Sequence, residues 1–434
     1  MKKVLIITYY WPPSGGIGVL RCLKFVKYLR GFGWEPIVVA PSNPDYPYID
    51  KGNFKDIPEG IEVLYTPIWE PFRLFKFLTG RKSSSLNNIV HVRDKKSVFD
   101  ELGIWIRGNF FIPDARAFWI KPTVKALSQY LKTNRVDAIL SDGPPHTNTV
   151  IATKIAKKHN IPFLADFQDP WTQVDYYKLF KIGYFADIKH KMLEQECFKT
   201  ANKITIASPS WKKDIETIGA KNVDVVYYGY DEDDFKAIVP VPDKKFSICH
   251  AGLLGSDRNP ENLWIALNQL VENSNEFKEH LSIKILGQVD LSVINSIKKY
   301  NLERYLENKG IVVRATSLQE ISNAWLLLLP LNKADNVKGR IPGKFYEYIR
   351  TGRPVISFGP HGTDVNNIID DYSLGQNFEW DDVSLLKDYI FKYFENFLQD
   401  RFGSNRNIKE ISVFSNQNQT KMVAGYLNEI VKVH

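Results

Sequence analysis

The sequence predicts an α/β protein with two Rossmann-like domains, each built on a doubly wound parallel sheet. The chain has 434 residues, more than one hydrophobic core normally supports, so two domains of roughly 200 residues are expected. A strand, a glycine-containing loop and a helix follow one another twice, at residues 4–29 and 246–271. Residues 326–329 are four consecutive leucines, and such a strand is typical of a sheet that helices cover on both faces.

The first domain begins with an apolar, β-rich run at residues 4–8, followed by a loop with Gly15 and Gly16 and by a helix with one apolar face. Adjacent glycines allow backbone amides to approach a ligand closely. Their spacing differs from G-x-G-x-x-G, which disfavours a dinucleotide-dependent hydride-transfer enzyme. Residues 36–40 supply the next strand, so a right-handed parallel βαβ unit is predicted.

Residues 69–121 interrupt this alternation and are predicted to form an insertion. Apolar residues from Trp69 to Leu78 are interleaved with basic residues from Arg73 to Lys82. Such a segment suits a membrane interface or the wall of an acceptor cleft. A helix packed on its own domain, with its lysines in water, is the alternative, because apolar residues occupy more than one face.

Polar residues follow the next two strands, which are predicted at residues 136–140 and 162–165. The first strand leads into SDGPPHTNT, which contains His146, and the second leads into DFQDPW, which contains Asp166 and Asp169. The carboxyl ends of parallel strands meet at one edge of a sheet, where ligands usually bind, so these residues are functional candidates. Alternatively, His146 caps the following helix and the aspartates satisfy loop amides.

The boundary between the domains is predicted near residue 235. Strands at residues 203–207 and 223–228 complete the first half, and the acidic, proline-containing stretch at residues 229–242 is interpreted as a hinge. Asp231 and Asp233 within it are interpreted as solvated carboxylates, so no metal site is predicted. The predicted organisation is an N-terminal domain at 1–235, a second domain at 236–408 and a C-terminal helix at 409–434 that packs back on the N-terminal domain.

The second domain repeats the order of strand, glycine-containing loop and helix. Residues 246–251 form the predicted strand, and Gly252 begins the loop. Arg258 precedes the helix and is placed to reach a phosphate, although an exposed loop arginine is the simpler interpretation. Further strands are predicted at residues 283–286, 311–313 and 325–330.

The stretch IPGKFYEYIRTGRPVISF, at residues 341–358, carries the predicted chemistry of this domain. Pro342 and Gly343 open a helix, and Lys344 and Glu347 project from one side of its first turns. Helix-start amides and a lysine attract phosphate, whereas a glutamate accepts hydrogen bonds from sugar hydroxyls. The arrangement therefore suits a nucleoside diphosphate and its ribose. An ordinary surface ion pair on an amphipathic helix is the alternative.

Composition and charge indicate the class of binding partner and the cellular compartment of the protein. The net charge is +8, with 44% hydrophobic and 24% charged residues, which is typical of a folded protein with an anionic partner. No nucleic-acid-binding motif was recognised, which favours phosphorylated ligands or an anionic membrane surface over nucleic acid. Three separated cysteines and no recognisable signal peptide or membrane span predict a cytoplasmic protein, with the inner face of the cell membrane as a further expected location.

Together these motifs resemble the GT-B-fold glycosyltransferases, in which two such domains face each other across a cleft. The resemblance is to the large retaining group called family 4, and to its bacterial surface-polysaccharide members. YYWPPSGGIGVLR is similar to that group's first glycine loop, DVVYYGYDEDDF to its interdomain hinge, and HAGLLGSDRNPENL to its second loop. PGKFYEY is similar to its donor signature, and SDGPPH and DFQDPW resemble acceptor-side segments.

The resemblance implies a role for each matching residue. It implies that Arg258 and Lys344 neutralise the donor phosphates, that Glu347 holds the ribose hydroxyls, and that His146 and Asp169 are catalytic residues facing the transferred sugar or the acceptor. The other implied donor-binding residues are Gly15, Gly16, Gly252, Ile341 and Gly343.

Two positions depart from the family pattern. The fuller signature has two glutamates separated by seven residues, and Gly339 occupies the position of the first. Contacts to the transferred sugar must then come from the loop at residues 336–341, so the donor sugar is left open. Leu253 replaces the first basic residue of the second glycine loop.

The implied activity is transfer of a sugar from a nucleotide-diphosphate sugar to a hydroxyl of a glycan or lipid-linked acceptor, in the synthesis of cell-surface polysaccharide or glycoconjugate. The donor is first expected to be UDP-linked, with GDP as the second choice, and the reaction to proceed with retention and without metal or cofactor. One alternative is an epimerase of related fold with Asp166 and Asp169 as its acid and base. The other is a non-catalytic, nucleotide-sugar-binding partner subunit, in keeping with Gly339 and Leu253.

Overall fold

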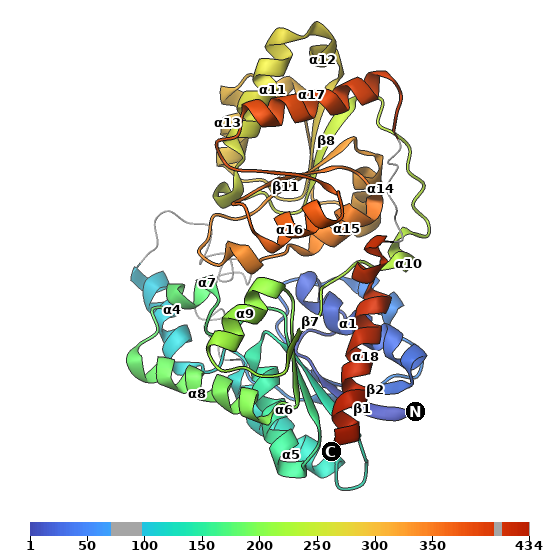
Figure 1. Cartoon of the computed structure of the whole chain (residues 1–434). Helices are drawn as coiled ribbons and strands as arrows, with labels where there is room; N and C mark the ends of the chain where they lie inside the picture. The colour runs from blue at the N-terminus through green and yellow to red at the C-terminus, as the bar shows by residue number, and fades with distance from the viewer. Residues whose placement is uncertain (71–97, 403–409, 434) are drawn as a thin grey trace. The chain divides into compact units, whose positions relative to one another are not determined.

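The structure, a computed structural model, describes residues 1–70, 98–402 and 410–433 (Figure 1). The chain divides into two compact units, one formed by Met1–Tyr227 with Asn416–His434 and the other by Tyr228–Ser415. Each unit contains one parallel β-sheet with helices connecting its strands. The predicted α/β class with two doubly wound domains is confirmed.

The first unit has seven strands in the order β3-β2-β1-β4-β5-β6-β7. The strands are β1 (Lys2–Ile7), β2 (Trp34–Pro41), β3 (Glu62–Thr66), β4 (Ala138–Gly143), β5 (Phe163–Phe167), β6 (Lys203–Ile206) and β7 (Val223–Val225). The described helices are α1 (Ile17–Leu29), α4 (Val98–Phe110), α5 (Ile120–Tyr130), α6 (His146–His159), α7 (Asp175–Leu179), α8 (Tyr184–Thr200), α9 (Pro209–Thr217) and α18 (Asn416–Val433).

Alternation of apolar side chains explains the packing of this unit. Val4 and Ile6 of β1 pack in one core cluster with Leu23 of α1 and Leu427 of α18. Strand order reverses between β1 and β4, so right-handed crossovers place α1 and α6 on opposite faces of the sheet. The C-terminal helix α18 packs against α1, as its amphipathic pattern predicted.

The second unit has six strands in the order β10-β9-β8-β11-β12-β13. The strands are β8 (Phe246–Ala251), β9 (Leu281–Leu286), β10 (Leu306–Gly310), β11 (Leu326–Pro330), β12 (Val355–Phe358) and β13 (Gly375–Phe378). The helices are α10 (Glu232–Phe235), α11 (Glu261–Asn273), α12 (Asn275–His280), α13 (Leu291–Lys299), α14 (Arg314–Asn323), α15 (Gly343–Thr351), α16 (Asp364–Asp371) and α17 (Ser384–Leu398).

The leucine run forms the centre of this second sheet. Leu326 and Leu328 of β11 lie in a core cluster with Trp264 of α11 and Phe394 of α17. Strand order reverses between β8 and β11, so the loops after these two strands lie at the topological switch point. Open α/β sheets usually bind ligands there.

One predicted strand is displaced. Residues 311–313 were expected to be extended because they are apolar, but the strand is β10, which ends at Gly310. Ile311 and Val313 are exposed. Because β10 is an edge strand, the polar residues of LENKG can face water, and periodicity misses such a strand.

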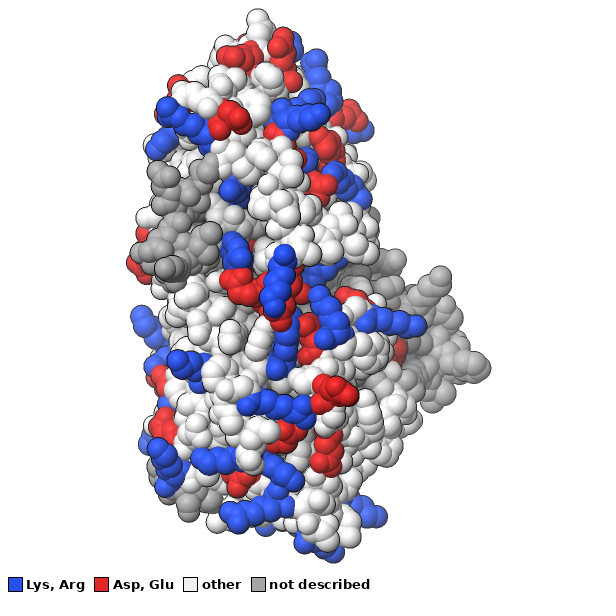
Figure 2. All heavy atoms as spheres, turned by 90° about the vertical axis from the view of Figure 1, so that its right-hand side faces the viewer, with Lys and Arg blue, Asp and Glu red and all other residues white. Residues whose placement is uncertain are grey.

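The predicted insertion is only partly described by the structure. The basic and aromatic segment from Phe72 to Lys82 lies outside the described residues. No helix in the described part of the chain has both the length and the apolar character needed to cross a bilayer. On the face shown in Figure 2, basic and acidic side chains are interspersed rather than gathered by sign.

Candidate functional site

Lys344 approaches the loop that follows β8 in the second unit. It occupies the first turn of α15, which begins at Gly343 after Pro342. The Nζ atom of Lys344 lies 3.1 Å from Nε2 of His250, near the end of β8. A Cβ at Gly252 would lie 2.8 Å from this Nζ, and Gly252 has a φ of +99°, so the close approach requires glycine.

Hydrogen bonds fix the protonation of His250. Its Nδ1 lies 2.9 Å from the carbonyl oxygen of Leu328, so Nδ1 carries the proton and donates it. Burial, together with the positive charge of Lys344, holds the pKa of His250 well below its ordinary value, so the ring is neutral. Nε2 therefore accepts a hydrogen bond from Lys344 and supplies no negative charge.

Positive charge accumulates at this switch point. Burial and the nearby guanidinium of Arg258 lower the pKa of Lys344 to about 7, although Glu347 acts in the opposite direction. Arg258 is paired with its neighbour Asp257, with 3.1 Å between Nη2 and Oδ2. The structure thus brings together Arg258 and Lys344, two cations predicted from sequence to act on one group. An anion that binds here would relieve the repulsion between them.

Glu347, predicted to hold ribose hydroxyls, is bound by Arg314 from the start of α14. The Arg314 Nη2 atom lies 2.7 Å from Oε1 of Glu347 and 3.2 Å from Oδ2 of Asp234. Burial raises the pKa of Glu347 above its ordinary value, and the charge of Arg314 opposes this rise. A ribose at Glu347 would share the carboxylate with Arg314.

Sequence reasoning missed two of these groups. His250 was assigned only to a strand, although its position at the strand end before a glycine loop was a usable signal. Arg314 follows the misplaced strand at residues 311–313, and no local pattern links it to Glu347. Of the other residues predicted here, Ile341 is buried in the loop before α15 and Leu253 is exposed.

In the first unit, one amide of the loop with Gly15 and Gly16 already donates a hydrogen bond within the protein. The amide of Gly15 donates to the carbonyl oxygen of Tyr48 at 2.9 Å. Gly16 is the N-cap residue of α1 and has a φ of +83°, which favours glycine. The predicted phosphate contact of these amides stays a prediction.

Asp166 belongs to a buried ion pair beneath the carboxyl ends of the first sheet. Its Oδ2 lies 2.6 Å from Nε of Arg21, its Oδ1 lies 2.7 Å from Nη2, and both side chains are fully buried. Thr205 donates a further hydrogen bond to Oδ1. Asp166, a candidate from its place at a strand end, thus has the geometry of a structural group.

Asp142 is the second carboxyl group of this buried cluster. It accepts hydrogen bonds from the hydroxyl group of Thr8 and the amide group of Gln168. Burial and the charge of Asp166 raise the pKa of Asp142 to about 7. The interior at this switch point is therefore acidic, with two carboxyl groups around the single guanidinium of Arg21.

His146 lines a cavity of about 300 Å³ in the first unit. Its ring stacks in parallel on Trp171, with 4.6 Å between the ring centroids. Within the described part of the chain, neither ring nitrogen has a hydrogen-bond partner, and both are buried. Burial and the nearby His190 lower the pKa of His146 to about 3. The imidazole is thus neutral, and His146 begins α6 without capping it by its side chain.

Aromatic rings and two arginines form most of the remaining cavity wall. Trp171 comes from the DFQDPW segment and donates through Nε1 to Nδ1 of His190 at 3.1 Å. The other aromatic and basic lining residues are Tyr10, Phe111, Tyr177, Phe180, Arg107 and Arg116. Asp169 is half-buried in the same segment and is not among the lining residues. Aromatic faces with a few polar groups suit a sugar ring.

Metal-ligating side chains do not gather anywhere in the described ranges: no group of three or more His, Cys, Asp or Glu residues there has the arrangement of a metal site. Asp231, from the acidic hinge sequence, instead caps α10 by accepting a hydrogen bond from the amide of Asp233 at 3.0 Å. The expectation that Asp231 is solvated is therefore wrong: its side chain is buried, because it caps a helix.

Comparison with known proteins shows the fold. No protein-family profile and no curated protein sequence matches the chain. Among solved structures, a Staphylococcus aureus TarM variant in complex with fondaparinux, α-GlcNAc-glycerol and UDP matches with a TM-score of 0.57 and 13% identity, covering 99% of this chain and 100% of that one. WaaG, a glycosyltransferase involved in lipopolysaccharide biosynthesis, matches with a TM-score of 0.55 and 12% identity, covering 99% and 100%.

The same fold also occurs with another described activity. A candidate UDP-N-acetylglucosamine 2-epimerase from Listeria monocytogenes matches with a TM-score of 0.52 and 11% identity, covering 100% of this chain and 97% of that one. At these identities the likeness establishes the GT-B fold of the chain. It leaves the reaction to be argued from the site.

Proposed function

We propose that this protein is a glycosyltransferase that moves a sugar from a nucleotide-diphosphate sugar to a hydroxyl of a glycan or lipid-linked acceptor. The observation that carries the proposal is the group of Lys344, His250 and Arg258 at the switch point of the second unit. Two cations lie there beside a neutral imidazole and Gly252, where an added Cβ would come within 2.8 Å of the Lys344 Nζ atom. This is a site for a compact anion with two phosphates.

The donor half of the reaction follows from this charge. When the bond between the anomeric carbon and the phosphate oxygen breaks, negative charge grows on the departing diphosphate. Lys344, Arg258 and the amides that begin α15 stabilise that charge, and Glu347 binds the ribose. Gly252, Gly343 and the loop that ends at Ile341 shape the site. We propose Gly15 and Gly16 as further phosphate contacts.

The acceptor half is assigned to the cavity around His146. With a pKa of about 3, His146 is too weak a base to remove a proton at neutral pH. Its ring nitrogens instead hydrogen-bond a hydroxyl of the acceptor or of the transferred sugar, while Trp171 and its neighbours pack against the ring. Asp169 is proposed to act beside it from the same segment as Trp171.

The finer assignments belong to the proposal as well. A UDP-linked donor is the first choice and a GDP-linked donor the second, in keeping with the UDP in the TarM complex. Retention, family 4 membership and a role in cell-surface polysaccharide synthesis are proposed from the family resemblance alone. Metal independence is proposed because Lys344 and Arg258 supply positive charge where other transferases use a metal ion. Cytoplasmic location, at the inner face of the membrane, completes the proposal.

Of the two alternative functions, the structure disfavours the epimerase, and the partner subunit remains to be distinguished by assay. An epimerase that uses Asp166 and Asp169 as acid and base is disfavoured, since Asp166 is fully engaged by Arg21 and Thr205. A nucleotide-sugar-binding partner subunit remains compatible with Gly339 and Leu253, which replace a glutamate and a basic residue of the family pattern.

Assays with a panel of UDP- and GDP-sugars separate these functions. A transferase is expected to release nucleoside diphosphate slowly, and faster when a suitable glycan or lipid-linked acceptor is present. An epimerase would convert the donor into an isomer without acceptor, and a binding subunit would shift the melting temperature without turnover. Either of these two results would overturn the proposal.

A further inference from the structure

One surface of the first unit carries exposed apolar side chains from neighbouring helices. We call it the docking surface. Its residues are Leu102, Trp105, Ile106 and Phe110 of α4, Leu179 of α7, and Tyr184, Phe185, Ile188 and Met192 of α8. On α4 the spacing is i, i+3, i+4 and i+8, and on α8 residues 184, 188 and 192 are four apart, so each helix presents one stripe. Phe185 is 85% exposed and Phe110 is 69% exposed.

Polar contacts hold the two stripes side by side. Oδ1 of Asn109, on α4, accepts a hydrogen bond from the amide of Gly183 at 2.7 Å, directly before α8. Lys181 pairs with Glu101 across the same junction, with 3.3 Å between their charged atoms. Helices α4, α7 and α8 accordingly lie together in Figure 1. The two helices that carry the stripes therefore lie next to each other, and clustered exposed apolar side chains often mark an interaction site.

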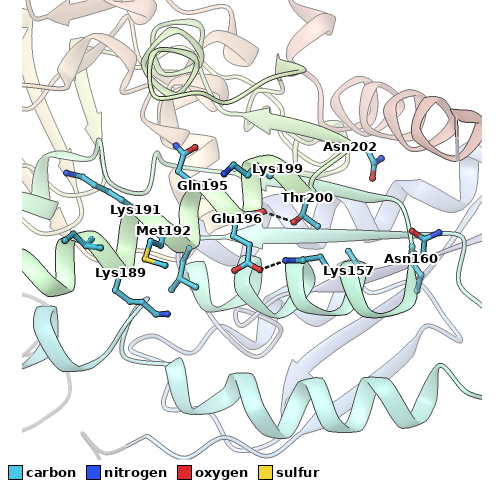
Figure 3. A pocket seen from close by; sticks show the side chains of 14 residues that line it. Lys157, Asn160, Lys189, Lys191, Met192, Gln195, Glu196, Lys199, Thr200 and Asn202 are labelled. Carbon is cyan, nitrogen blue, oxygen red and sulfur yellow. Dashed lines mark hydrogen bonds and ion pairs between the residues drawn. The ribbon is translucent and has the colours of Figure 1, made fainter.

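Lysines border the docking surface on the side of α8. Ile188 and Met192 also line a groove of about 850 Å³ between α6 and α8 (Figure 3). Four lysines line this groove: Lys157, Lys189, Lys191 and Lys199. Glu196 is the single acidic residue among its lining residues, and it pairs with Lys157 at 2.7 Å. Positive charge therefore exceeds negative charge next to the apolar stripe.

The docking surface shares elements with the wall of the cavity around His146. Arg107 and Phe111, which flank the exposed stripe of α4, line that cavity, as do Phe180 and Ile182 between α7 and α8. The guanidinium of Arg107 lies over the Phe180 ring, 5.6 Å from its centroid. The elements that present the apolar side chains to solvent thus also enclose the proposed acceptor cavity.

We propose that the docking surface binds a membrane surface that contains anionic lipids. Exposed Trp, Tyr and Phe side chains suit the level of the lipid headgroups, and the bordering lysines suit their phosphates. Because the same elements wall the His146 cavity, bound membrane would present a lipid-linked acceptor to that cavity. The inference rests on the proposed function, which already places the protein at a membrane, and it adds the surface that makes the contact.

Sedimentation with lipid vesicles tests membrane binding on the full chain without any turnover. The protein is expected to bind vesicles of phosphatidylcholine with phosphatidylglycerol, and to bind pure phosphatidylcholine less. The double variant Tyr184→Ser with Phe185→Ser should lower vesicle partitioning roughly tenfold or more, because two aromatic side chains no longer enter the interface. Both residues are exposed, so the circular-dichroism spectrum and the melting temperature should not change.

A matched control lies in the second unit. Ile311 and Val313 are 77% and 72% exposed, so the double variant Ile311→Ser with Val313→Ser removes similar apolar exposure and should leave vesicle binding unchanged. Lys189→Ser should reduce the preference for phosphatidylglycerol. No binding to anionic vesicles, or equal losses in both double variants, would overturn the proposal. The proposal would also be overturned if the unmodified protein forms a dimer that the Tyr184→Ser/Phe185→Ser variant dissociates, and neither protein binds vesicles. Donor hydrolysis in solution reports separately on the proposed function.

Discussion

A cation lies near the carboxyl ends of the sheet in each unit, but its surroundings differ: Arg21 is fully buried among carboxyl groups and Lys344 is half-buried. In the first unit, Arg21 donates two hydrogen bonds to Asp166 and one to the carbonyl oxygen of Tyr227 at 2.8 Å, and Asp142 adds a second carboxyl group. In the second unit, Lys344 has the neutral ring of His250 as its neighbour and Arg258 as a repelling charge.

This difference predicts a structural role for Arg21 and a ligand-binding role for Lys344. A buried cation that carboxylates fully engage has no electrostatic reason to bind a further anion, and its removal leaves those carboxylates uncompensated. Lys344 has a neutral imidazole beside it and is repelled by Arg258, and the opposing attraction of Glu347, which Arg314 already pairs, does not restore its ordinary pKa, so an incoming anion is expected to stabilise it. Sheets of similar topology therefore surround a cation with different charges, and this difference is the basis for proposing a structural role for Arg21 and a ligand-binding role for Lys344.

The largest effect is expected from breaking the balanced pair. Arg21→Ala should lower the free energy of unfolding by about 3–5 kcal/mol, because Asp166 becomes a buried charge without its cation. Denaturation in urea, followed by tryptophan fluorescence, measures this loss. Arg30→Ala removes a more exposed pair with Glu35 and should cost less than about 1 kcal/mol. Equal losses in the two variants would contradict the structural role of Arg21.

A second, smaller effect is expected from removing the unbalanced cation. Lys344→Ala should lower turnover at least tenfold, roughly 1.4 kcal/mol of barrier, because the departing diphosphate loses a positive partner. The free energy of unfolding should not fall, since no buried carboxylate depends on Lys344 alone. Steady-state kinetics and urea denaturation measure the two quantities. Lys278→Ala, at an exposed site on α12, is the control and should change neither. Unchanged turnover in Lys344→Ala would refute its assigned role.

The smallest expected effect concerns pH. The pKa of Lys344 is about 7 in the free protein, and a bound diphosphate raises it, so the protonated form binds more tightly. Affinity for UDP should therefore weaken as pH rises from 7 to 9, by less than about tenfold over the whole range, because Arg258 and the helix-start amides still contact the diphosphate. Calorimetric titrations at several pH values measure the change. Lys344→Arg should remove most of this dependence, because a guanidinium stays protonated across the range. An equal pH dependence in that variant would assign the proton to another group.

Local sequence patterns were sufficient for the architecture and for part of the site. Apolar runs and glycine loops predicted the two parallel sheets, and the helix that begins at Gly343 placed Lys344 and Glu347 on one side. The reason is that strand and helix periodicity act over a few residues. The edge strand β10 shows the limit of such patterns, since its polar residues face water and the neighbouring apolar run at 311–313 does not form a strand.

Only the tertiary structure decided which charges meet. His250 and Lys344 are 94 residues apart in the sequence, and Arg21 and Asp166 are 145 apart, so no local pattern connects them. The same holds for Arg314 with Glu347 and for the exposed stripes of α4 and α8. The sequence by itself determined which segments form strands, loops and helices, because that depends on near neighbours. Folding decided which charges surround each of these cations, because that depends on distant partners and on exclusion of water.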